Sequence, residues 1–273
     1  MSGHHPIING INPDVANVAR IYDFFLGGKD NFAADRAAAA KIVEAAPSVV
    51  QRAKENRAFL GRAVQFAARE GIRQFVDIGT GLPTQENVHE VAKRGTRFAR
   101  VAYVDHDPMV VAHARAILAT DPRTIAVEAD LRKPEMVLRQ VTKSGFIDFQ
   151  RPTAIFMVAV LHFLADCSEL TQVVARYREI MAPGSFLIIS HATPGDMSEG
   201  DKAQALQTYA TTSAGGITLR SREEIARFFE GLVLAEPGLV PVAHWRPEGL
   251  TPVAISGPTF LGGVARKPAG APA

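Results

Sequence analysis

The chain is poor in cysteine and has no long apolar run, and both shortages exclude classes of protein. Its 273 residues include a single cysteine, Cys167, so no disulfide can form within the chain and no cysteine cluster can hold zinc. No uninterrupted apolar stretch approaches the ~18 residues that a membrane-spanning helix needs. The first residues lack the basic and apolar regions of a secretory signal. We therefore expect a cytoplasmic protein without a membrane partner.

The chain also lacks an excess of charge of either sign. It has 30 Lys and Arg against 28 Asp and Glu, and its basic residues are dispersed. This balance gives no electrostatic reason to expect a nucleic-acid partner, and it favours a small-molecule substrate. The histidines are scattered and no His-Glu-x-x-His occurs, so we expect no metal site. Without Gly-x-Ser-x-Gly, a serine hydrolase is disfavoured. The oligomeric state stays open.

From Arg73 onward, short apolar runs alternate with helix-like segments. The apolar runs, which predict strands, are 74–78, 100–104, 124–128, 153–160 and 185–190. The segments between them, which predict helices, are 84–94, 108–119, 134–141 and 168–182. Continuously apolar strands are typical of a parallel sheet covered on both faces. Repeated strand–helix units with short connections predict an α/β fold with a doubly wound sheet.

Three helices are predicted ahead of the first strand. The first begins with Asn12 as its N-cap and Pro13 at the first helical position, and it ends at Gly27. Two alanine-rich segments, 33–45 and 48–69, follow it. We expect these helices to form a cap or lid beside the sheet. The chain is accordingly divided into an N-terminal arm and cap (1–70), a core (71–267) and a loose tail (268–273).

The C-terminal part predicts further elements and a second candidate lid. A helix is expected near 201–211 and another after Ser221, and the stretches 239–245 and 259–266 suggest a terminal hairpin. The polar segment 192–216 is one lid candidate. The other is the polar set that surrounds the glycine pair 27–28, namely Arg20, Tyr22, Lys29, Asp30 and Asn31.

A glycine turn follows the first predicted strand. Asp77 precedes Gly79-Thr80-Gly81, and glycine allows a ligand to approach the backbone closely because it has no Cβ. The third position of a dinucleotide fingerprint is Thr84 and not glycine, so this turn alone fits a plain tight connection as well. Asp105 and Asp130 end the next two apolar runs. Three acids at one sheet edge indicate a nucleoside site, because ligands lie beyond the carboxyl ends of such strands.

These residues resemble the motif series of class I S-adenosylmethionine-dependent methyltransferases. Six further segments are more specific, and they resemble an actinomycete-type bacterial family of predicted S-adenosyl methyltransferases, formerly a domain of unknown function. They lie in residues 19–32, 56–59, 77–91, 104–108, 158–163 and 236–240. The resemblance covers about residues 13–267. It implies a Rossmann-like, seven-stranded and mostly parallel sheet of order 3-2-1-4-5-7-6, with the last strand antiparallel, capped by N-terminal helices.

The resemblance also implies a cofactor, S-adenosylmethionine, with S-adenosylhomocysteine as product. Gly79, Thr80 and Gly81 would approach its methionine and ribose parts, and Asp77 would orient that loop or reach the amino group through water. Asp105 would bind the ribose diol. At the adenine, the implied contacts are His106 beside the ring, Asp130 at the exocyclic amine and the backbone N–H of Leu131. Ala159 would line the methyl-transfer channel.

The catalytic group is less defined by the sequence. Tyr22, His162 and His191 are candidates, and either histidine could act as a general base or be a buried structural residue. The sequence favours a methyltransferase that acts on a small molecule by direct transfer. Two alternatives remain, a non-catalytic protein that binds S-adenosylmethionine or S-adenosylhomocysteine and, less favoured, an NAD(P)-dependent oxidoreductase.

Overall fold

A computed structural model describes residues 11–83, 86–119, 121–165, 167–249, 257 and 259–269. Thr84, most of the predicted N-terminal arm and the end of the predicted tail lie outside these described residues. Within them, no helix is both long and apolar enough to cross a membrane.

The centre of the molecule is a mixed sheet of order β3-β2-β1-β4-β5-β8-β6, in which the short β7 also pairs with β8. Its strands are β1 (Gln74–Ile78), β2 (Arg100–Asp105), β3 (Thr124–Glu128), β4 (Ala154–Val158), β5 (Phe186–Thr193), β6 (Val233–Leu234), β7 (Val240–Pro241) and β8 (Thr259–Arg266). Strands β1 to β5 are parallel, and β8 is antiparallel to β5, β6 and β7. The predicted fold class is confirmed, with the last strand inserted antiparallel between β5 and β6. The predicted stretch 239–245 contains β7, whereas β6 lies outside every predicted stretch, and the sheet has eight described strands instead of the seven predicted.

Two layers of helices cover this sheet, because alternate residues of each strand face opposite sides. Phe75 packs in the core with α3 (Val49–Arg69) and α4 (Val88–Gly95). Val76 packs in the opposite core with α6 (Pro134–Val141), α7 (Cys167–Ile180) and α9 (Arg222–Arg227). Outside the cap, the other helical segments are α5 (Pro108–His113), the π-helical η1 (Ala114–Leu118) and the 3-10 turns η2 (Lys143–Gly145), η3 (Leu161–Phe163) and η4 (Val242–His244). The central strands are mostly apolar because both of their faces are buried.

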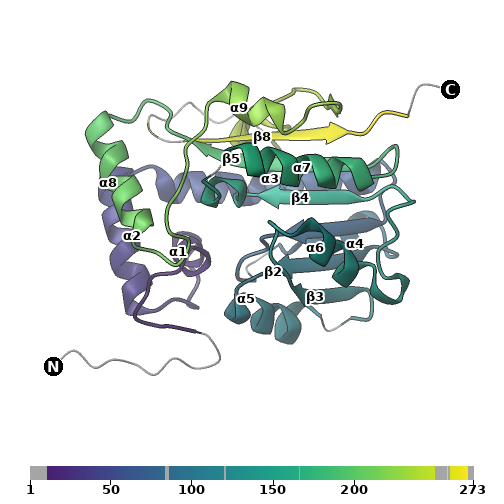
Figure 1. The fold of residues 1–273 in the computed structure, drawn as a ribbon, viewed down its shortest axis with the longest axis horizontal. Helices are drawn as coiled ribbons and strands as arrows, with labels where there is room; N and C mark the ends of the chain where they lie inside the picture. The colour runs from purple at the N-terminus through teal and green to yellow at the C-terminus, as the bar shows by residue number, and fades with distance from the viewer. Residues whose placement is uncertain are drawn as a thin grey trace.

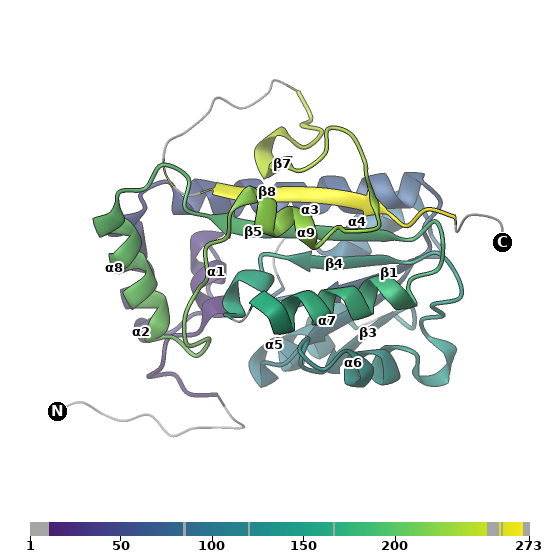
Figure 2. The same ribbon diagram turned by 45° about the horizontal axis from the view of Figure 1, so that its top comes forward.

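The cap is built from two segments that are far apart in the sequence. Helices α1 (Val18–Phe25) and α2 (Ala33–Ala45) come from the N-terminal region, and α8 (Glu199–Ala210) comes from the connection after β5. They share a small core around Ile21 and Ile42, with Tyr209 of α8 packed against it. Figures 1 and 2 show α8 beside α2, on the side of the sheet toward which β4 points. Both segments that the sequence suggested as lids therefore lie at one end of the molecule.

The predicted start of the first helix is wrong by several residues. Asn12 and Pro13 lie in a turn, in which the Asn12 side chain accepts from the N–H of Asp14 at 3.0 Å. Helix α1 begins at Val18, and Asn17 is its N-cap, with its side-chain oxygen accepting from the N–H groups of the next turn. The Asn17 amide is also held by residues outside the helix, which a local sequence pattern does not reveal.

A buried ion pair fixes the start of the cap. Asp35 has no exposed side-chain surface and accepts from Arg20 Nε at 2.7 Å. It also accepts from the N–H groups of Asn17 at 2.8 Å and Phe32 at 2.7 Å. The Arg20 guanidinium in turn donates to the Val15 carbonyl at 2.6 Å. Arg20 is thus a structural tie between α1 and α2.

We expect Asp35→Ala to destabilise the protein by about 3–5 kcal/mol, because it leaves the buried Arg20 guanidinium without its carboxylate. The free energy of unfolding in urea measures this loss. Glu44→Ala, at an exposed position on the same helix, is the matched control and should change stability by less than about 0.5 kcal/mol. Equal stabilities for the two variants would contradict the assigned role of the ion pair.

Candidate functional site

A cavity of about 230 Å³ lies at the carboxyl ends of β1, β2 and β4, beneath the cap. Its wall combines these strand ends with residues of α1, α3 and η3 and with Ser213 and Ala214. All of the residues predicted to bind the cofactor line it: Asp77, Gly79, Thr80, Gly81, Asp105, His106, Asp130, Leu131 and Ala159. Tyr22 and His162 also line it, whereas His191 is not part of its wall. The structure therefore gathers residues that span much of the chain into one site.

The glycine loop is fastened to the neighbouring strand. The N–H of Gly79 donates to the Val104 carbonyl of β2 at 2.8 Å, and Thr80 Oγ1 donates to Asp77 Oδ2 at 2.7 Å. Gly79 has a φ of +72°, which favours glycine. A Cβ at this residue would lie 2.4 Å from Cγ2 of Val160, so the loop also needs glycine for space.

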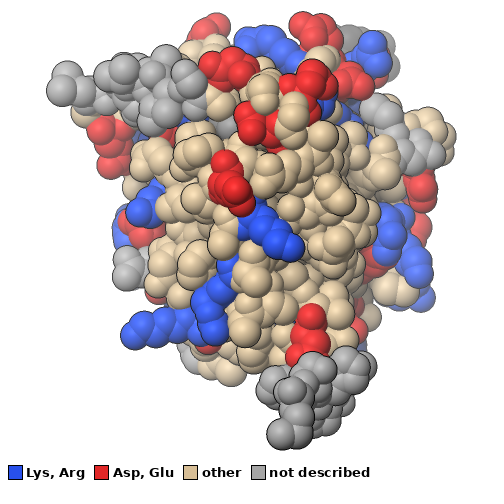
Figure 3. Space-filling model, turned by 90° about the vertical axis from the view of Figure 1, so that its left-hand side faces the viewer, with Lys and Arg blue, Asp and Glu red and all other residues tan. Residues whose placement is uncertain are grey.

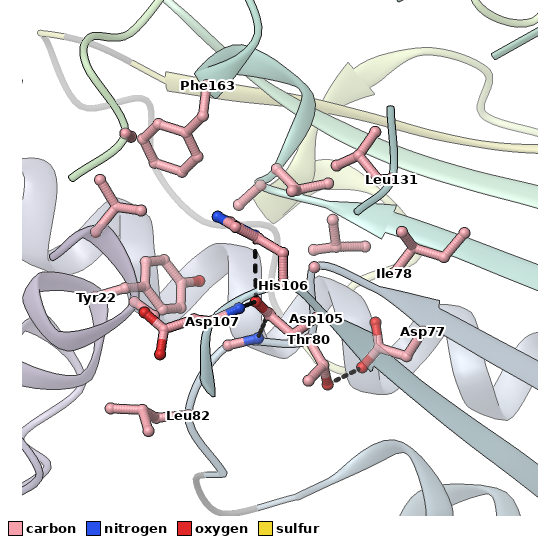
Figure 4. Close-up of a pocket in the computed structure, with 18 of the residues that line it drawn as sticks. Tyr22, Asp77, Ile78, Thr80, Leu82, Asp105, His106, Asp107, Leu131 and Phe163 are labelled. Atoms are coloured by element: carbon pink, nitrogen blue, oxygen red, sulfur yellow. Dashed lines mark hydrogen bonds and ion pairs between the residues drawn. The ribbon is translucent and has the colours of Figure 1, made fainter. Parts of the chain in front are cut away.

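Asp105 braces this loop against the turn that follows β2. Its Oδ2 accepts from the N–H of Gly81 at 3.0 Å, and its Oδ1 accepts from the N–H of Asp107 at 3.0 Å (Figure 4). The His106 ring lies on the same side, with Nδ1 3.6 Å from Oδ1. Burial raises the pKa of Asp105, although the two backbone N–H groups oppose that shift. Since a carboxylate has about four acceptor positions, Asp105 can still accept from a ligand diol.

Asp77 is a buried carboxyl group at the end of β1. Burial raises its pKa from the ordinary 3.8 to about 6, while the hydrogen bond from Thr80 and the positive charge of Arg57 act in the opposite direction. The nearby Asp105 raises it further. The Asp77 carboxyl group therefore changes from neutral to negatively charged as the pH rises through about 6.

Asp130, which was predicted to read the adenine amine, has an internal partner. Arg132 donates to it through Nε at 2.9 Å and through Nη2 at 2.7 Å, and the Arg132 N–H adds a third bond. Partial burial raises the pKa of Asp130, but these hydrogen bonds outweigh it and the pKa is lowered. An adenine amine would share this carboxylate with Arg132, so the adenine role stays a prediction.

A chain of hydrogen bonds joins the strand ends to the cap. The N–H of Ala159 donates to Ser190 Oγ at 3.0 Å, and Ser190 Oγ donates to Asn56 Oδ1 at 2.6 Å. Asn56 Nδ2 donates to Tyr22 Oη at 2.9 Å, and Tyr22 Oη donates to the Ala53 carbonyl at 3.0 Å. Ala159 has a φ of +55°, an unfavourable value for alanine that this chain helps to hold. The cavity wall at β4 is thereby coupled to α1 and α3.

The three candidate catalytic groups are all engaged in the fold. The Tyr22 hydroxyl donates to a carbonyl, and burial raises its pKa. His162 is buried, and its Nδ1 accepts from the Ala192 N–H at 3.4 Å. Burial first, and then the neighbouring His191 and Arg220, lower the pKa of His162 well below 6.5 and keep it neutral.

His191 is disfavoured as a base by its position. One ring nitrogen, Nδ1, lies 2.8 Å from the Ala192 carbonyl, and Nε2 lies 2.8 Å from an Arg220 nitrogen. These partners assign the proton to Nδ1. Burial lowers the pKa of His191 to about 3, and Arg220 adds to that shift. The ring is a fully buried packing element outside the cavity wall.

The lid candidate around Gly27 and Gly28 is only partly at the site. Of its polar set, Tyr22 lines the cavity, whereas Arg20, Lys29, Asp30 and Asn31 do not. The N–H of Asp30 at 3.0 Å and Asn31 Nδ2 at 2.9 Å donate instead to Asp23 Oδ2, and Asp23 lines the cavity.

Several cavity residues received no role from the sequence. Asn17 Nδ2 donates to Asp107 Oδ2 at 2.6 Å and to Ser213 Oγ at 3.0 Å, which joins α1 to the turn after β2 and to the segment after α8. Asn56 and Arg57 also line the cavity. Their only sequence signal is that they lie within one of the family-like segments, because several other polar residues precede them in the same helix.

Comparisons with known proteins agree with this architecture. A family model described as S-adenosyl methyltransferase matches residues 5–268. A solved structure of a putative methyltransferase from Thermobifida fusca is 40% identical, with coverage of 97% of this chain and 100% of that one and a TM-score of 0.86. A DUF574 family protein from Streptomyces avermitilis is 36% identical, with coverage of 94% and 99% and a TM-score of 0.86. A comparison with curated proteins found no match.

A more distant structure shows the likeness of fold alone. It is an O-methyltransferase family protein from Burkholderia thailandensis, 18% identical, with coverage of 82% of this chain and 61% of that one and a TM-score of 0.50.

We expect Gly79→Ala to destabilise the protein more than Gly81→Ala. Both positions have positive φ, and alanine there costs about 1–2 kcal/mol. Only the Gly79 substitution adds a clash, with Val160, because a Cβ at Gly81 meets nothing within 4 Å. Urea unfolding should show a further loss of about 1–3 kcal/mol for Gly79→Ala, partly restored by adding Val160→Ala. Equal losses in the two single variants would contradict the packing argument.

The pKa of Asp77 predicts a pH dependence of stability. A raised folded-state pKa gives stability that is fully present below about pH 4 and is lost as the pH rises through about 6. Asp77→Asn cannot titrate, so its free energy of unfolding should gain about 3 kcal/mol relative to the wild type between pH 4 and 7. Urea unfolding at a series of pH values measures the difference. Glu128→Gln, at an exposed acid, should run parallel to the wild type, and a parallel Asp77→Asn curve would refute the assignment.

Proposed function

This chain belongs to the S-adenosyl methyltransferase family, and we propose that it binds S-adenosylmethionine in the cavity and transfers the methyl group directly to a small molecule. The observation that carries the proposal is the convergence of the glycine loop, Asp105 and Asp130 at one edge of the parallel sheet. That edge is where ligands of such sheets bind.

The charge of the cavity supports this cofactor over a nicotinamide dinucleotide. The carboxylates in its wall are those of Asp23, Asp77, Asp105, Asp107 and Asp130, and the guanidiniums are those of Arg57 and Arg132. S-adenosylmethionine carries a sulfonium and an ammonium against one carboxylate, whereas NAD(P) carries negative phosphates. An acid-rich cavity attracts the first and repels the second.

Each part of the cofactor then has a partner in the wall. Asp105 accepts from the ribose hydroxyls with the lone pairs that the Gly81 and Asp107 N–H groups leave. Ionised Asp77 faces the ammonium of the cofactor. The glycine loop leaves room for the methionine part of the cofactor, which joins the ammonium to the ribose. His106, Asp130 and Leu131 surround the adenine. S-adenosylhomocysteine is the product that remains after transfer.

The cap side of the cavity receives the acceptor. Among the wall residues, Tyr22 and Leu26 of the cap and Phe163, Leu164 and Phe260 from η3, its C-cap and β8 are apolar or aromatic. The bound cofactor supplies an activated methyl group, and these side chains exclude water and hold the acceptor atom in line with it. Both candidate bases in the wall are neutral and hydrogen-bonded to the fold, so the acceptor atom is one that is nucleophilic without their help.

A macromolecular acceptor has less support. Figure 3 shows the side of the molecule that carries α2 and α8. On it, the described Lys and Arg residues form a short line and a group at one edge, interspersed with Asp and Glu around a broad uncharged area. A nucleic acid is bound chiefly through a basic surface, so this face favours a small acceptor.

The same engaged histidine and tyrosine also suit a protein that binds the cofactor without turning it over. Release of S-adenosylhomocysteine distinguishes a methyltransferase from a protein that only binds the cofactor. A methyltransferase releases S-adenosylhomocysteine when it is incubated with S-adenosylmethionine and a panel of small hydroxyl and amine acceptors. A binder releases none.

Thermal unfolding with separate additions of S-adenosylmethionine, S-adenosylhomocysteine and NADPH tests the cofactor. A ligand present at about 100 times its dissociation constant should stabilise the protein by about 2.7 kcal/mol. We expect stabilisation with the first two ligands. Stabilisation by NADPH alone would overturn the proposal.

Calorimetry of two acid variants tests the role of Asp105. Asp105→Ala should weaken S-adenosylhomocysteine binding by about 10- to 100-fold, because it removes the acceptor for the ribose hydroxyls. Glu128→Ala is the control, since Glu128 is the register partner of Asp105 on β3 but is exposed and outside the cavity wall. Unchanged affinity for Asp105→Ala would assign that carboxylate a purely structural role.

A further inference from the structure

Among the described residues, the cap contributes a single carboxylate to the cavity wall, that of Asp23 on α1. The other wall carboxylates lie at or just after the ends of β1, β2 and β3, and they belong to Asp77, Asp105, Asp107 and Asp130. Asp23 therefore lines the cavity from the side on which the proposed acceptor lies.

Only one oxygen of the Asp23 carboxylate is hydrogen-bonded. Oδ2 accepts from the N–H of Asp30 at 3.0 Å and from Asn31 Nδ2 at 2.9 Å. Oδ1 accepts from no donor in the described part of the chain, and it is not one of the polar atoms that are fully enclosed. Because Asp23 as a whole is only 2% exposed, the access that Oδ1 keeps is from the cavity that this residue lines.

The fold gives this carboxylate room but no cation. A Cβ at Gly28 would clash with Oδ1, so the second glycine of the pair leaves the space that the carboxylate occupies. No described Lys, Arg or His forms an ion pair with Asp23. Burial raises its pKa, and the hydrogen bonds from Asn31 and the Asp30 N–H oppose that shift without cancelling it. A buried charge without a partner costs free energy, so Oδ1 needs a donor from outside the chain.

The cofactor does not supply this donor. In the proposed binding mode its ammonium faces Asp77, its ribose hydroxyls face Asp105 and its adenine amine faces Asp130, all at the sheet edge. The sulfonium carries a positive charge but has no N–H or O–H to donate. The ligand that fits Asp23 is therefore the second one, the methyl acceptor.

We infer that Asp23 binds the ammonium of an amine-bearing acceptor. The inference rests on the proposed function and narrows its substrate class. Tyr22 and Leu26 lie beside Asp23 on the cavity face of α1, so the rest of the acceptor is an alkyl or aromatic body. A positive charge satisfies the free oxygen through a charge-assisted hydrogen bond, whereas a neutral hydroxyl satisfies it less well. Asp23 thereby selects the acceptor, and the methyl transfer itself stays as proposed above.

Calorimetry with matched ligand pairs tests the inference in protein saturated with S-adenosylhomocysteine. The pairs are benzylamine with benzyl alcohol, phenethylamine with phenethyl alcohol, and hexylamine with hexanol. The wild type should bind the amine of at least one pair about 10- to 100-fold more tightly than its alcohol. Asp23→Asn should lose this preference by weakening amine binding, while it changes the affinity of the alcohol by less than about threefold.

Two controls separate recognition from a structural role. Asp23→Asn keeps the shape of the side chain and one oxygen that can accept from Asp30 and Asn31. Its free energy of unfolding should therefore equal or exceed that of the wild type, because an unpaired buried charge is removed. Asp30→Asn removes a half-exposed carboxylate of the same loop that is outside the cavity wall, and it should leave the amine preference unchanged.

A wild type that binds no amine more tightly than its alcohol, or an Asp23→Asn variant that keeps the preference, would overturn the inference. Weaker binding of S-adenosylmethionine but not of S-adenosylhomocysteine in Asp23→Asn would assign the carboxylate to the sulfonium and overturn it as well. Failure of the wild type to bind S-adenosylhomocysteine would instead overturn the proposed cofactor. The wild-type comparison decides the matter even where the variant fails to fold.

Discussion

The carboxylate of Asp105 is the contact on which the site depends. It binds the N–H of Gly81 on one side and that of Asp107 on the other, and so fixes the glycine loop relative to the turn after β2. Asp107 then caps α5 and accepts from Asn17, the N-cap of α1. One continuous set of hydrogen bonds thus runs from the end of β2 to the loop, to α5 and to the cap. Because Asp105 is buried, its charge requires these donors, and the geometry of the cavity follows from satisfying it.

The cap is part of the site rather than an addition to it. Helix α1 and its N-cap supply Tyr22 and Asn17 to the cavity wall, and the neighbouring α3 supplies Asn56 and Arg57. The chain of bonds from Ala159 through Ser190 and Asn56 crosses from the sheet to these helices. A change in the cap therefore reaches the strand ends through a few specific contacts. This arrangement gives a physical reason for cofactor affinity to depend on residues that precede the first strand.

The local sequence pattern was sufficient to predict the strands that are buried on both faces. The runs that became β1 to β5 are apolar because both faces of the sheet are covered, so their positions could be read directly. The strand-end acids were likewise visible because parallel strands place their carboxyl ends at one edge.

The first helix shows where prediction from local sequence fails. Asn12 followed by Pro13 satisfied the rules for a helix start, yet Asn17 is the cap because Asp107 and Ser213, distant in the sequence, hold its amide. His191 likewise suited a base by position, but its ring packs away from the cavity.

The sequence by itself determined where the apolar strands lie along the chain, where the glycine loop lies, and that three acids end strands at one edge of the sheet. These features depend on local composition and on strand direction. Through the resemblance it also indicated the cofactor class. Only the tertiary structure decided that α8 completes the cap, that Arg132 engages Asp130, and that Asn56 and Arg57 face the cavity. These facts depend on which side chains meet across long sequence separations. The sequence of a helix does not reveal the hydrogen-bond partners of its polar residues. Those partners are defined only in the folded chain, where buried polar groups need hydrogen bonds.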